Sequence, residues 1–165
     1  MNSIDLIRGN LTRSADYTLA KIEDMRDHCF VFPTSHGGGH TMWVLGHLAY
    51  VEGLVIHEFM FGDTNPVAKW KPTFDGDEVT ADQERYPPFD EVLFLCREMR
   101  AKTIDLINKL KENDLDKVSA NAPKGQEAIF GDYRLCLQFV ADHWLMHRGQ
   151  LAGARRVAEK NRMWF

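Results

Sequence analysis

Residues 132–160, with the sequence DYRLCLQFVADHWLMHRGQLAGARRVAEK, form the stretch that decides the fold class. Apolar and histidine side chains recur in it at steps of three and four residues, which is the period of an α-helix. The seam consists of Cys136, Phe139, Val140, His143, His147, Gln150, Leu151, Ala154 and Ala158. Arg155, Arg156 and Lys160 follow near the end, where cations interact favourably with a helix dipole. We therefore expect one long helix over residues 132–160.

Three further stretches of the chain have the same helical period. The first covers residues 3–27, with Ser3 as the expected N-cap. The second covers residues 41–61 and ends before Gly62, a residue that suits a left-handed helix terminus. The third covers residues 90–113. Four helices with apolar faces and almost no strand pattern predict an all-α four-helix bundle.

Two connections between these helices are long. From His28 to His40 the chain contains Pro33 and the run Gly37–Gly39, which cannot continue a helix at low cost. Residues 62–88 are rich in proline, glycine and aspartate and have no sustained period. A loop of this length is unusual inside a compact domain, and in helical bundles it is often a crossover along the bundle. We expect a crossover between the second and third helices, with both connections either capping a site or only covering the bundle end.

The composition is that of one acidic globular domain. The chain has 165 residues, 44% of them hydrophobic, and its 20 Lys and Arg against 24 Asp and Glu give a net charge of −4. This length and apolar content suit a single domain over residues 1–165 with a substantial core. The acidic balance removes the broad basic surface on which non-specific nucleic-acid binding depends. We expect no nucleic-acid partner.

The cysteines and the apolar stretches indicate in which cellular compartment we expect the protein. Cys29, Cys96 and Cys136 are odd in number and scattered, which favours reduced core thiols in a cytoplasmic protein over a disulfide framework. The first residues lack the basic and apolar regions of a signal peptide. The most apolar stretch is interrupted by His47 and Glu52, so we expect no membrane span.

Two histidines of the last predicted helix have the spacing of a metal-binding pair. His143 and His147 are four positions apart, so their side chains point within about 40° of each other, one helical turn apart. Both lie on the apolar seam, where imidazoles without partners are costly to bury. A divalent metal would remove that cost, because neutral imidazole is a good donor to Zn²⁺, Ni²⁺ or Fe²⁺.

His47 is the best candidate for a third ligand. It lies in the middle of the second predicted helix, on the same apolar face as Trp43. A lone histidine in such a place is more often a hydrogen-bonded core residue, and a His-x-x-x-His spacing also occurs by chance. Three histidines that face one interior from two helices are better explained by a single site. We therefore predict a metal site formed by His47, His143 and His147.

The other four histidines need no metal. His57 points about 80° away from His47 around the helix, and we expect it at the surface or an interface. His28 lies at a helix end, where its charge suits the dipole. His36 and His40 flank the three glycines. His40 shares a face with His47 two turns away, so it could line a pocket mouth but cannot bind the same ion.

Two motifs resemble a known family of helical bundles. Residues 43–49, WVLGHLA, and residues 143–151, HWLMHRGQL, are similar to the DinB-like (damage-inducible) superfamily of metal-binding four-helix bundles. The resemblance covers essentially the whole chain. It implies an up-down-down-up bundle, a divalent metal held by His47, His143 and His147, and frequently a homodimer.

Relatives in that family have several chemistries. They include thiol-dependent transferases and isomerases that use bacillithiol or mycothiol, and the iron-binding half of synthases that form ergothioneine sulfoxides. The His-x-x-x-His-x-Glu pattern of the iron synthases is not matched here, because position 149 is Gly149. The mycothiol isomerase has a glutamate where this chain has His143. The resemblance therefore favours neither of these two subfamilies.

The expected function is that of a metal-dependent enzyme acting on a small molecule. Three histidine ligands leave a coordination position open, as in catalytic rather than structural sites. An open position suits activation of a low-molecular-weight thiol, in a thiol transferase, or of water, in a hydrolase. The alternative is a non-catalytic metal-binding protein of stress response or interaction, in which apolar residues of the last helix such as Leu145 form a homodimer contact.

Three polar residues have roles that the sequence leaves open. Tyr50 and Gln150 are close in helical phase to His47 and His147, and could contact substrate or hydrogen-bond to the ligands. Glu58 is in phase with His47 but about 16 Å away along the helix axis. Each of the three is also compatible with an ordinary place in the bundle.

Overall fold

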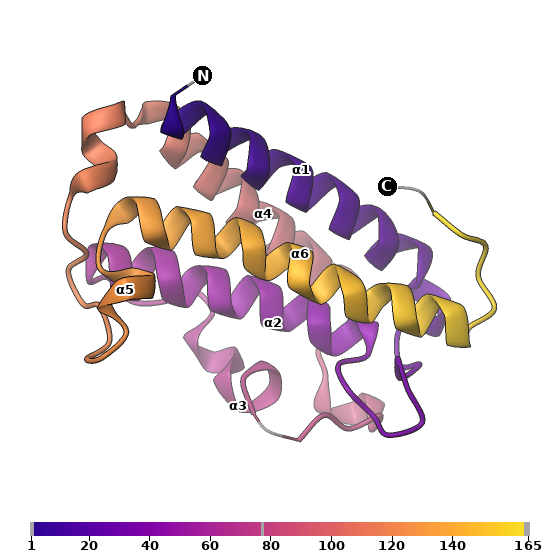
Figure 1. The fold of residues 1–165 in the computed structure, drawn as a ribbon. Coiled ribbons are helices and arrows are strands. Elements are labelled where there is room, and N and C mark those ends of the chain that lie inside the picture. Colours follow the sequence, from indigo (N-terminus) through magenta and orange to yellow (C-terminus); the bar gives the residue numbers. More distant parts are fainter. Residues whose placement is uncertain (1, 77, 164–165) are drawn as a thin grey trace.

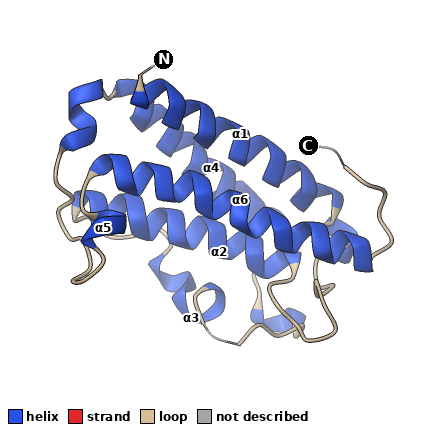
Figure 2. Cartoon of the chain, in the orientation of Figure 1, coloured by secondary structure: helices blue, strands red, loops and turns tan. Residues whose placement is uncertain are grey.

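The computed structural model describes residues 2–76 and 78–163, and within them the chain is helical (Figures 1 and 2). Its long helices are α1 (Ser3–Asp24), α2 (Thr41–Gly53), α4 (Phe89–Lys109) and α6 (Tyr133–Val157). A π-helix, Leu54–Phe61, continues α2 without a break. Short helices are α3 (Lys71–Phe74) and α5 (Glu127–Phe130), with 3-10 turns at Arg26–His28, Ala68–Trp70, Gln83–Arg85 and Glu112–Asp116. The all-α prediction is confirmed.

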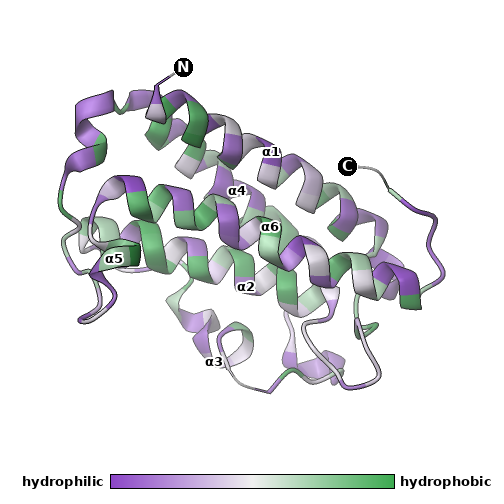
Figure 3. Ribbon diagram, in the orientation of Figure 1, coloured by the Kyte–Doolittle hydropathy of each residue, from purple (hydrophilic) through white to green (hydrophobic). Residues whose placement is uncertain are grey.

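The long helices enclose one hydrophobic core. α1 packs against α6 and α4, and α2 packs against the same two helices from the other side (Figure 1). Figure 3 shows apolar residues along all of these helices, and α2 is green or pale over most of its length. The structure buries α2 on nearly every side, whereas its periodicity predicts a single buried face. The difference arises because the connection after α2 folds back over its outer surface.

Two glycines allow that connection to lie against α2. A Cβ atom at Gly46 would lie 2.2 Å from Cε1 of Phe74, and one at Gly53 would lie 2.2 Å from Oδ1 of Asn65. The Asn65 side-chain amide donates a hydrogen bond to the backbone carbonyl of Tyr50, with a distance of 3.0 Å. Residues 62–88 therefore pack closely on α2, and they contain a short helix, α3, that the period analysis did not predict.

A buried ion pair connects the four long helices. Glu52 of α2 and Arg100 of α4 are 1% and 4% exposed, and their side chains lie 2.9 Å apart. The indole Nε1 of Trp144 in α6 donates to Glu52 over 2.9 Å, and Arg100 donates to the carbonyl of Leu11 in α1 over 3.1 Å. Because an unpaired charge in this core would be costly, these contacts favour one register of the helices over others.

The helix boundaries differ from the predicted ones by a few residues. α1 is capped by Asn2 rather than by Ser3, because the Asn2 side chain accepts a hydrogen bond from the amide of Asp5 over 3.1 Å. The first predicted helix continues past Asp24 only as a 3-10 turn. The left-handed terminus at Gly62 is confirmed, with φ of 75°.

The last two predicted helices are also shorter in the structure. The expected segments 90–113 and 132–160 correspond to α4 and α6, and the residues after α4 form a separate 3-10 turn. Asp132 lies outside α6 as its N-cap, where its side chain accepts a hydrogen bond from the amide of Leu135 over 2.8 Å. α5 precedes this cap, in the connection between α4 and α6.

One segment, Thr41–Phe61, is long and apolar enough to cross a membrane by length and composition, with a mean hydropathy of 1.2. In the bundle, 61% of that window is buried. Such burial is typical of the core helix of a helical bundle. That the chain has no membrane span stays a prediction.

Candidate metal centre

Three histidines converge between α2 and α6. His47 comes from α2, and His143 and His147 come from successive turns of α6. One nitrogen of each ring lies within 4.8 Å of the others, and Nε2 of His143 is 3.0 Å from Nε2 of His147. The structure thus brings together all three residues that the sequence predicts. These nitrogens are close enough to one another to bind one ion.

Hydrogen bonds orient two of the rings. Nδ1 of His47 lies 2.6 Å from the backbone carbonyl of Phe74, and Nδ1 of His147 lies 3.0 Å from Oε1 of Gln150. Since a carbonyl oxygen only accepts, each Nδ1 carries the proton and each Nε2 presents a lone pair. Metal-binding histidines in proteins are commonly held in this way by an acceptor on the second ring nitrogen.

Aromatic rings hold the imidazoles from the side. The Trp43 ring stacks on His47 with centroids 4.3 Å apart, and the Phe139 ring stacks on His143 at 5.5 Å. Both pairs are nearly parallel, with an interplanar angle of 14°. Trp43 and Phe139 each precede a histidine by four residues, so these contacts follow from helical spacing.

Burial keeps the three imidazoles neutral. Removal from water, the larger cause, and the nearby His47 together lower the pKa of His147 to about 4, although the hydrogen bond to Gln150 opposes the shift. Burial is also the main cause that lowers the pKa of His143 and of His47. Neutral imidazoles can bind a metal ion at neutral pH without first losing a proton.

The glycine run before α2 packs against this cluster. A Cβ atom at Gly39 would lie 2.9 Å from Oε1 of Gln150 and 2.8 Å from the Trp43 ring. One at Gly153 of α6 would lie 3.1 Å from the Pro33 side chain. The loop before α2 therefore contacts the acceptor of His147, as the connection after α2 supplies the acceptor of His47. Both loops do more than cover the bundle end.

The family model described as the DinB superfamily matches residues 10–151. The chain belongs to the DinB superfamily. The match includes all three histidines, both residues that accept their hydrogen bonds, and the two long connections. A search of curated proteins found no match to this chain.

In this DinB superfamily protein His40 has a structural role, as the N-cap of α2, that the sequence analysis did not predict. Its Nδ1 accepts the backbone N–H of Trp43 over 3.1 Å and so caps α2, while its Nε2 donates to the carbonyl of Thr80 over 2.9 Å. Phe30 and Tyr86 enclose the ring, with centroids 5.1 and 5.3 Å away. His40 lies outside the metal cluster, as its position two turns from His47 indicates.

The remaining singled-out residues also lie outside the cluster of three nitrogens. His28 and His36 are exposed, and His57 is half-buried on the π-helix. Tyr50 is 3% exposed, and burial raises the pKa of its hydroxyl. Glu58 contributes its backbone carbonyl to the Gly62 turn. Of the three polar residues left open, Gln150 alone hydrogen-bonds to a histidine of the cluster among the described contacts.

The three cysteines are free and buried, as predicted for core thiols. Burial raises the pKa of Cys29, Cys96 and Cys136. Ser119 contacts the Cys136 sulfur at 3.4 Å without making it accessible. Protonated, buried thiols are poor nucleophiles, so the histidine cluster is the better candidate for chemistry in this DinB superfamily protein.

Proposed function

We propose that this chain binds one divalent metal ion through Nε2 of His47, His143 and His147. The observation that carries the proposal is the convergence of three buried, neutral imidazoles whose donor atoms lie within 4.8 Å of one another. Their donor set of nitrogens suits zinc, nickel or iron(II) rather than magnesium or calcium, which prefer oxygen. Metal binding would replace the hydrogen bond between Nε2 of His143 and Nε2 of His147, which lie 3.0 Å apart, with bonds to the ion.

We further propose that the protein is a metal-dependent enzyme acting on a small molecule, with a low-molecular-weight thiol as substrate. Bound here, a divalent ion would supply Lewis acidity to a thiol or to water. The chain's own part is positional: Phe74 and Gln150 keep the imidazoles of His47 and His147 in the neutral, Nδ1-protonated form. Trp43 and Phe139 stack on the rings of His47 and His143 and cover one face of each. A hydrolase that uses the same centre is the second possibility.

The alternative function is metal binding without turnover, in a dimer. On α6, Leu145 and Met146 are 42% and 63% exposed, although both are large apolar residues. Trp144 and Leu137, two other apolar residues of the same helix, are fully buried inside the chain and cannot contact a partner. We therefore propose that a homodimer would form through the exposed part of α6. This apolar surface is smaller than the sequence suggests.

The order of the helices and the cellular location are proposals too. An up-down-down-up order is supported by the ion pair between Asp24, at the end of α1, and Arg155, in the last turn of α6. Buried free cysteines support a reducing, cytoplasmic location. An experimental structure tests the order, and fractionation of cells that produce the native protein tests the location.

A screen for thiol transfer tests the proposed activity. The protein, loaded with zinc, nickel or iron(II) in turn, is mixed with a panel of low-molecular-weight thiols and electrophiles, and the thioether product and the free thiol are quantified. We expect metal-dependent loss of thiol that His143→Ala abolishes. Release of acid or alcohol from esters and amides without any thiol would favour the hydrolase. Absence of turnover, together with absence of any thiol-dependent spectral change in the nickel or cobalt form, would favour the non-catalytic alternative.

A further inference from the structure

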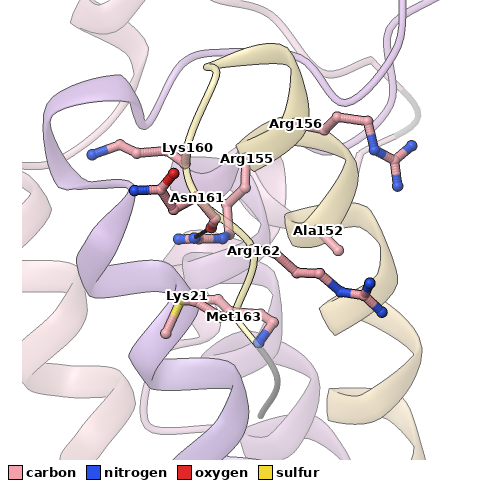
Figure 4. Close-up of a pocket in the computed structure, with 8 residues that line it drawn as sticks. All are labelled: Lys21, Ala152, Arg155, Arg156, Lys160, Asn161, Arg162 and Met163. Carbon is pink, nitrogen blue, oxygen red and sulfur yellow. Dashed lines mark hydrogen bonds between the residues drawn. The ribbon is translucent and has the colours of Figure 1, made fainter.

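A cavity lies at the C-terminal end of α6, beyond the histidines. It has a volume of about 430 Å³ and is bounded by the last turns of α1 and α6 and by the residues after α6 (Figure 4). Five cationic side chains line it: Lys21, Arg155, Arg156, Lys160 and Arg162. None of the described residues that line it is acidic. This concentration of positive charge occurs in a chain whose net charge is −4.

The chain after α6 turns back to form one wall of this cavity. Glu159 has a φ of 55°, a left-handed conformation that is uncommon for residues other than glycine. The turn is closed by the amide of Lys160, which donates to the carbonyl of Arg155 over 3.0 Å. The Arg155 guanidinium in turn donates to the carbonyl of Asn161. These contacts give the wall a defined position beside α6.

Two of the cations are buried. Lys21 is 4% exposed and Arg155 is 5% exposed. Burial lowers the pKa of both, and the neighbouring cations Arg148 and Arg155 lower that of Lys21 further. Asp24 forms an ion pair with Arg155, so part of the positive charge is already balanced. An anion in the cavity would favour the charged form of both buried groups.

The geometry of Arg155 suits an oxyanion. Its guanidinium has five N–H donors in a planar fork, and the contacts to Asp24 and Asn161 hold that fork in place. Figure 4 shows Arg155 and Asn161 together at the centre of the site, while Arg156, Lys160 and Arg162 extend toward its edges. A fixed guanidinium surrounded by further cations is a common arrangement for binding phosphate or carboxylate groups.

Helix dipoles explain only part of this cluster. Lys21 lies in the last turn of α1, and Arg155 and Arg156 lie in the last turn of α6, where cations are favoured without any ligand. The dipole effect does not account for Lys160 and Arg162, which follow the helix and line the edges of the same cavity. Nor does it require a hollow of this size between the two helix ends.

We propose that this cavity binds a small molecule with a phosphate or carboxylate group of more than one negative charge. The volume is within the range of small-molecule sites, roughly 300–1,000 Å³. One compact basic cluster at one end of a chain with net charge −4 differs from the extended basic face that nucleic acids need. The site is separate from the histidines, because Arg155 follows His147 by eight residues, about 12 Å along the helix.

Calorimetric titration of the metal-depleted full chain tests the proposal. The probes are inorganic pyrophosphate, succinate and a short single-stranded oligonucleotide, each at constant ionic strength set with chloride. We expect saturable binding, at about one site per chain, of pyrophosphate, succinate or both; which of them binds identifies the anionic group. Absence of saturable binding of both at millimolar concentration would overturn the proposal. Stronger binding of the oligonucleotide than of both small anions would also overturn it.

Variants locate the binding. Lys21→Met removes a buried charge and keeps an apolar side chain of similar length, so we expect it to fold and to weaken anion binding about tenfold or more. Arg156→Gln, at the edge, should weaken binding about threefold, and the matched exposed control Arg85→Gln should not change it. Unchanged affinity in folded Lys21→Met, or an equal loss in Arg85→Gln, would contradict the site. Binding should persist in His143→Ala, which excludes the histidine cluster as the anion site.

Discussion

The backbone carbonyl of Phe74 lies 2.6 Å from Nδ1 of His47, so a residue between α2 and α4 orients a predicted ligand on α2. The Phe74 side chain is fully buried and packs over Gly46, one residue before that ligand. The connection of residues 62–88 and the histidine cluster are therefore mechanically linked. A change that moves Phe74 should reach the cluster without altering any of its three imidazoles.

Gly46→Ala should lower metal affinity through that link. The new Cβ atom would lie 2.2 Å from Cε1 of Phe74 and force its ring away from α2, which lengthens the hydrogen bond to His47. Loss of such an acceptor typically lowers metal affinity about 10- to 100-fold, and overpacking costs about 1–3 kcal/mol of stability. Titration against a chelator of known affinity measures the first effect, and urea denaturation the second.

Gly149→Ala is the matched control for this substitution. Gly149 also lies inside a helix that carries ligands, but a Cβ atom there would meet nothing within 4 Å. We expect unchanged metal affinity and a stability gain of about 0.5–1 kcal/mol from helix propensity. If both alanine variants bind metal as tightly as the original chain, the link through Phe74 does not exist.

Gln150→Leu should weaken metal binding while the fold is kept. Gln150 accepts the proton of His147 Nδ1 over 3.0 Å, and leucine has a similar volume but no acceptor. We expect a loss of affinity of about tenfold or more. Gln150→Glu retains an acceptor and should recover most of the affinity. Equal affinities of the leucine and glutamate variants in the same chelator titration would argue against this role.

The sequence predicts the three histidines of the cluster but not the groups that accept their hydrogen bonds. His47, His143 and His147 were predictable because helical spacing alone places them on apolar faces that must meet. The acceptor of His47 was not predictable, because it is a backbone carbonyl and leaves no side-chain signature. The role of His40 was left open for a similar reason, because its second partner is the backbone carbonyl of Thr80, forty residues later.

Tertiary contacts also changed local expectations. Asn2 and Ser3 are both good N-caps, and the structure uses Asn2 because the amides of Ser3 and Ile4 bond instead to the carboxylate of Glu112. α2 is buried all round because the connection after it covers its outer face. Periodicity within one helix could reveal neither contact, since both depend on residues far along the chain.

The ion pair between Glu52 and Arg100 should be strongly coupled. Both side chains are at least 96% buried, so removing either one leaves a buried charge without its partner and should cost about 3–5 kcal/mol. Glu52→Met, Arg100→Met and the double variant form a thermodynamic cycle, measured by denaturant unfolding. We expect the double variant to be more stable than the sum of the single losses by about 1–3 kcal/mol. Additive losses would show that the pair does not act as a unit.

The metal-free protein should lose stability as the pH falls below about 6.5. His147 has a pKa of about 4 in the folded chain, below the ordinary histidine value, because burial disfavours its charge. Above pH 6.5 the residue is neutral in both states and contributes no pH dependence. Between these values only the unfolded chain binds the proton, so folding weakens by about 1.4 kcal/mol per pH unit for each such histidine.

His147→Gln provides the comparison for this pH dependence. Its unfolding free energy should fall less steeply over the same pH range, measured by urea denaturation at each pH with a chelator present. His143 and His47 have pKa values lowered for the same reason, so part of the slope should remain. Identical slopes for the variant and the original chain would mean that His147 is not held neutral by burial.

Metal content per chain tests the central claim most directly. The protein is saturated with zinc or nickel, freed of excess ion by gel filtration, and analysed by elemental mass spectrometry. His47→Ala, His143→Ala and His147→Ala are compared with His57→Ala, which changes a half-buried histidine outside the cluster. We predict about one ion per chain in the original protein and in His57→Ala, and essentially none in the three cluster variants. Full metal content in any folded cluster variant, or no stoichiometric metal in the original chain, would contradict the account.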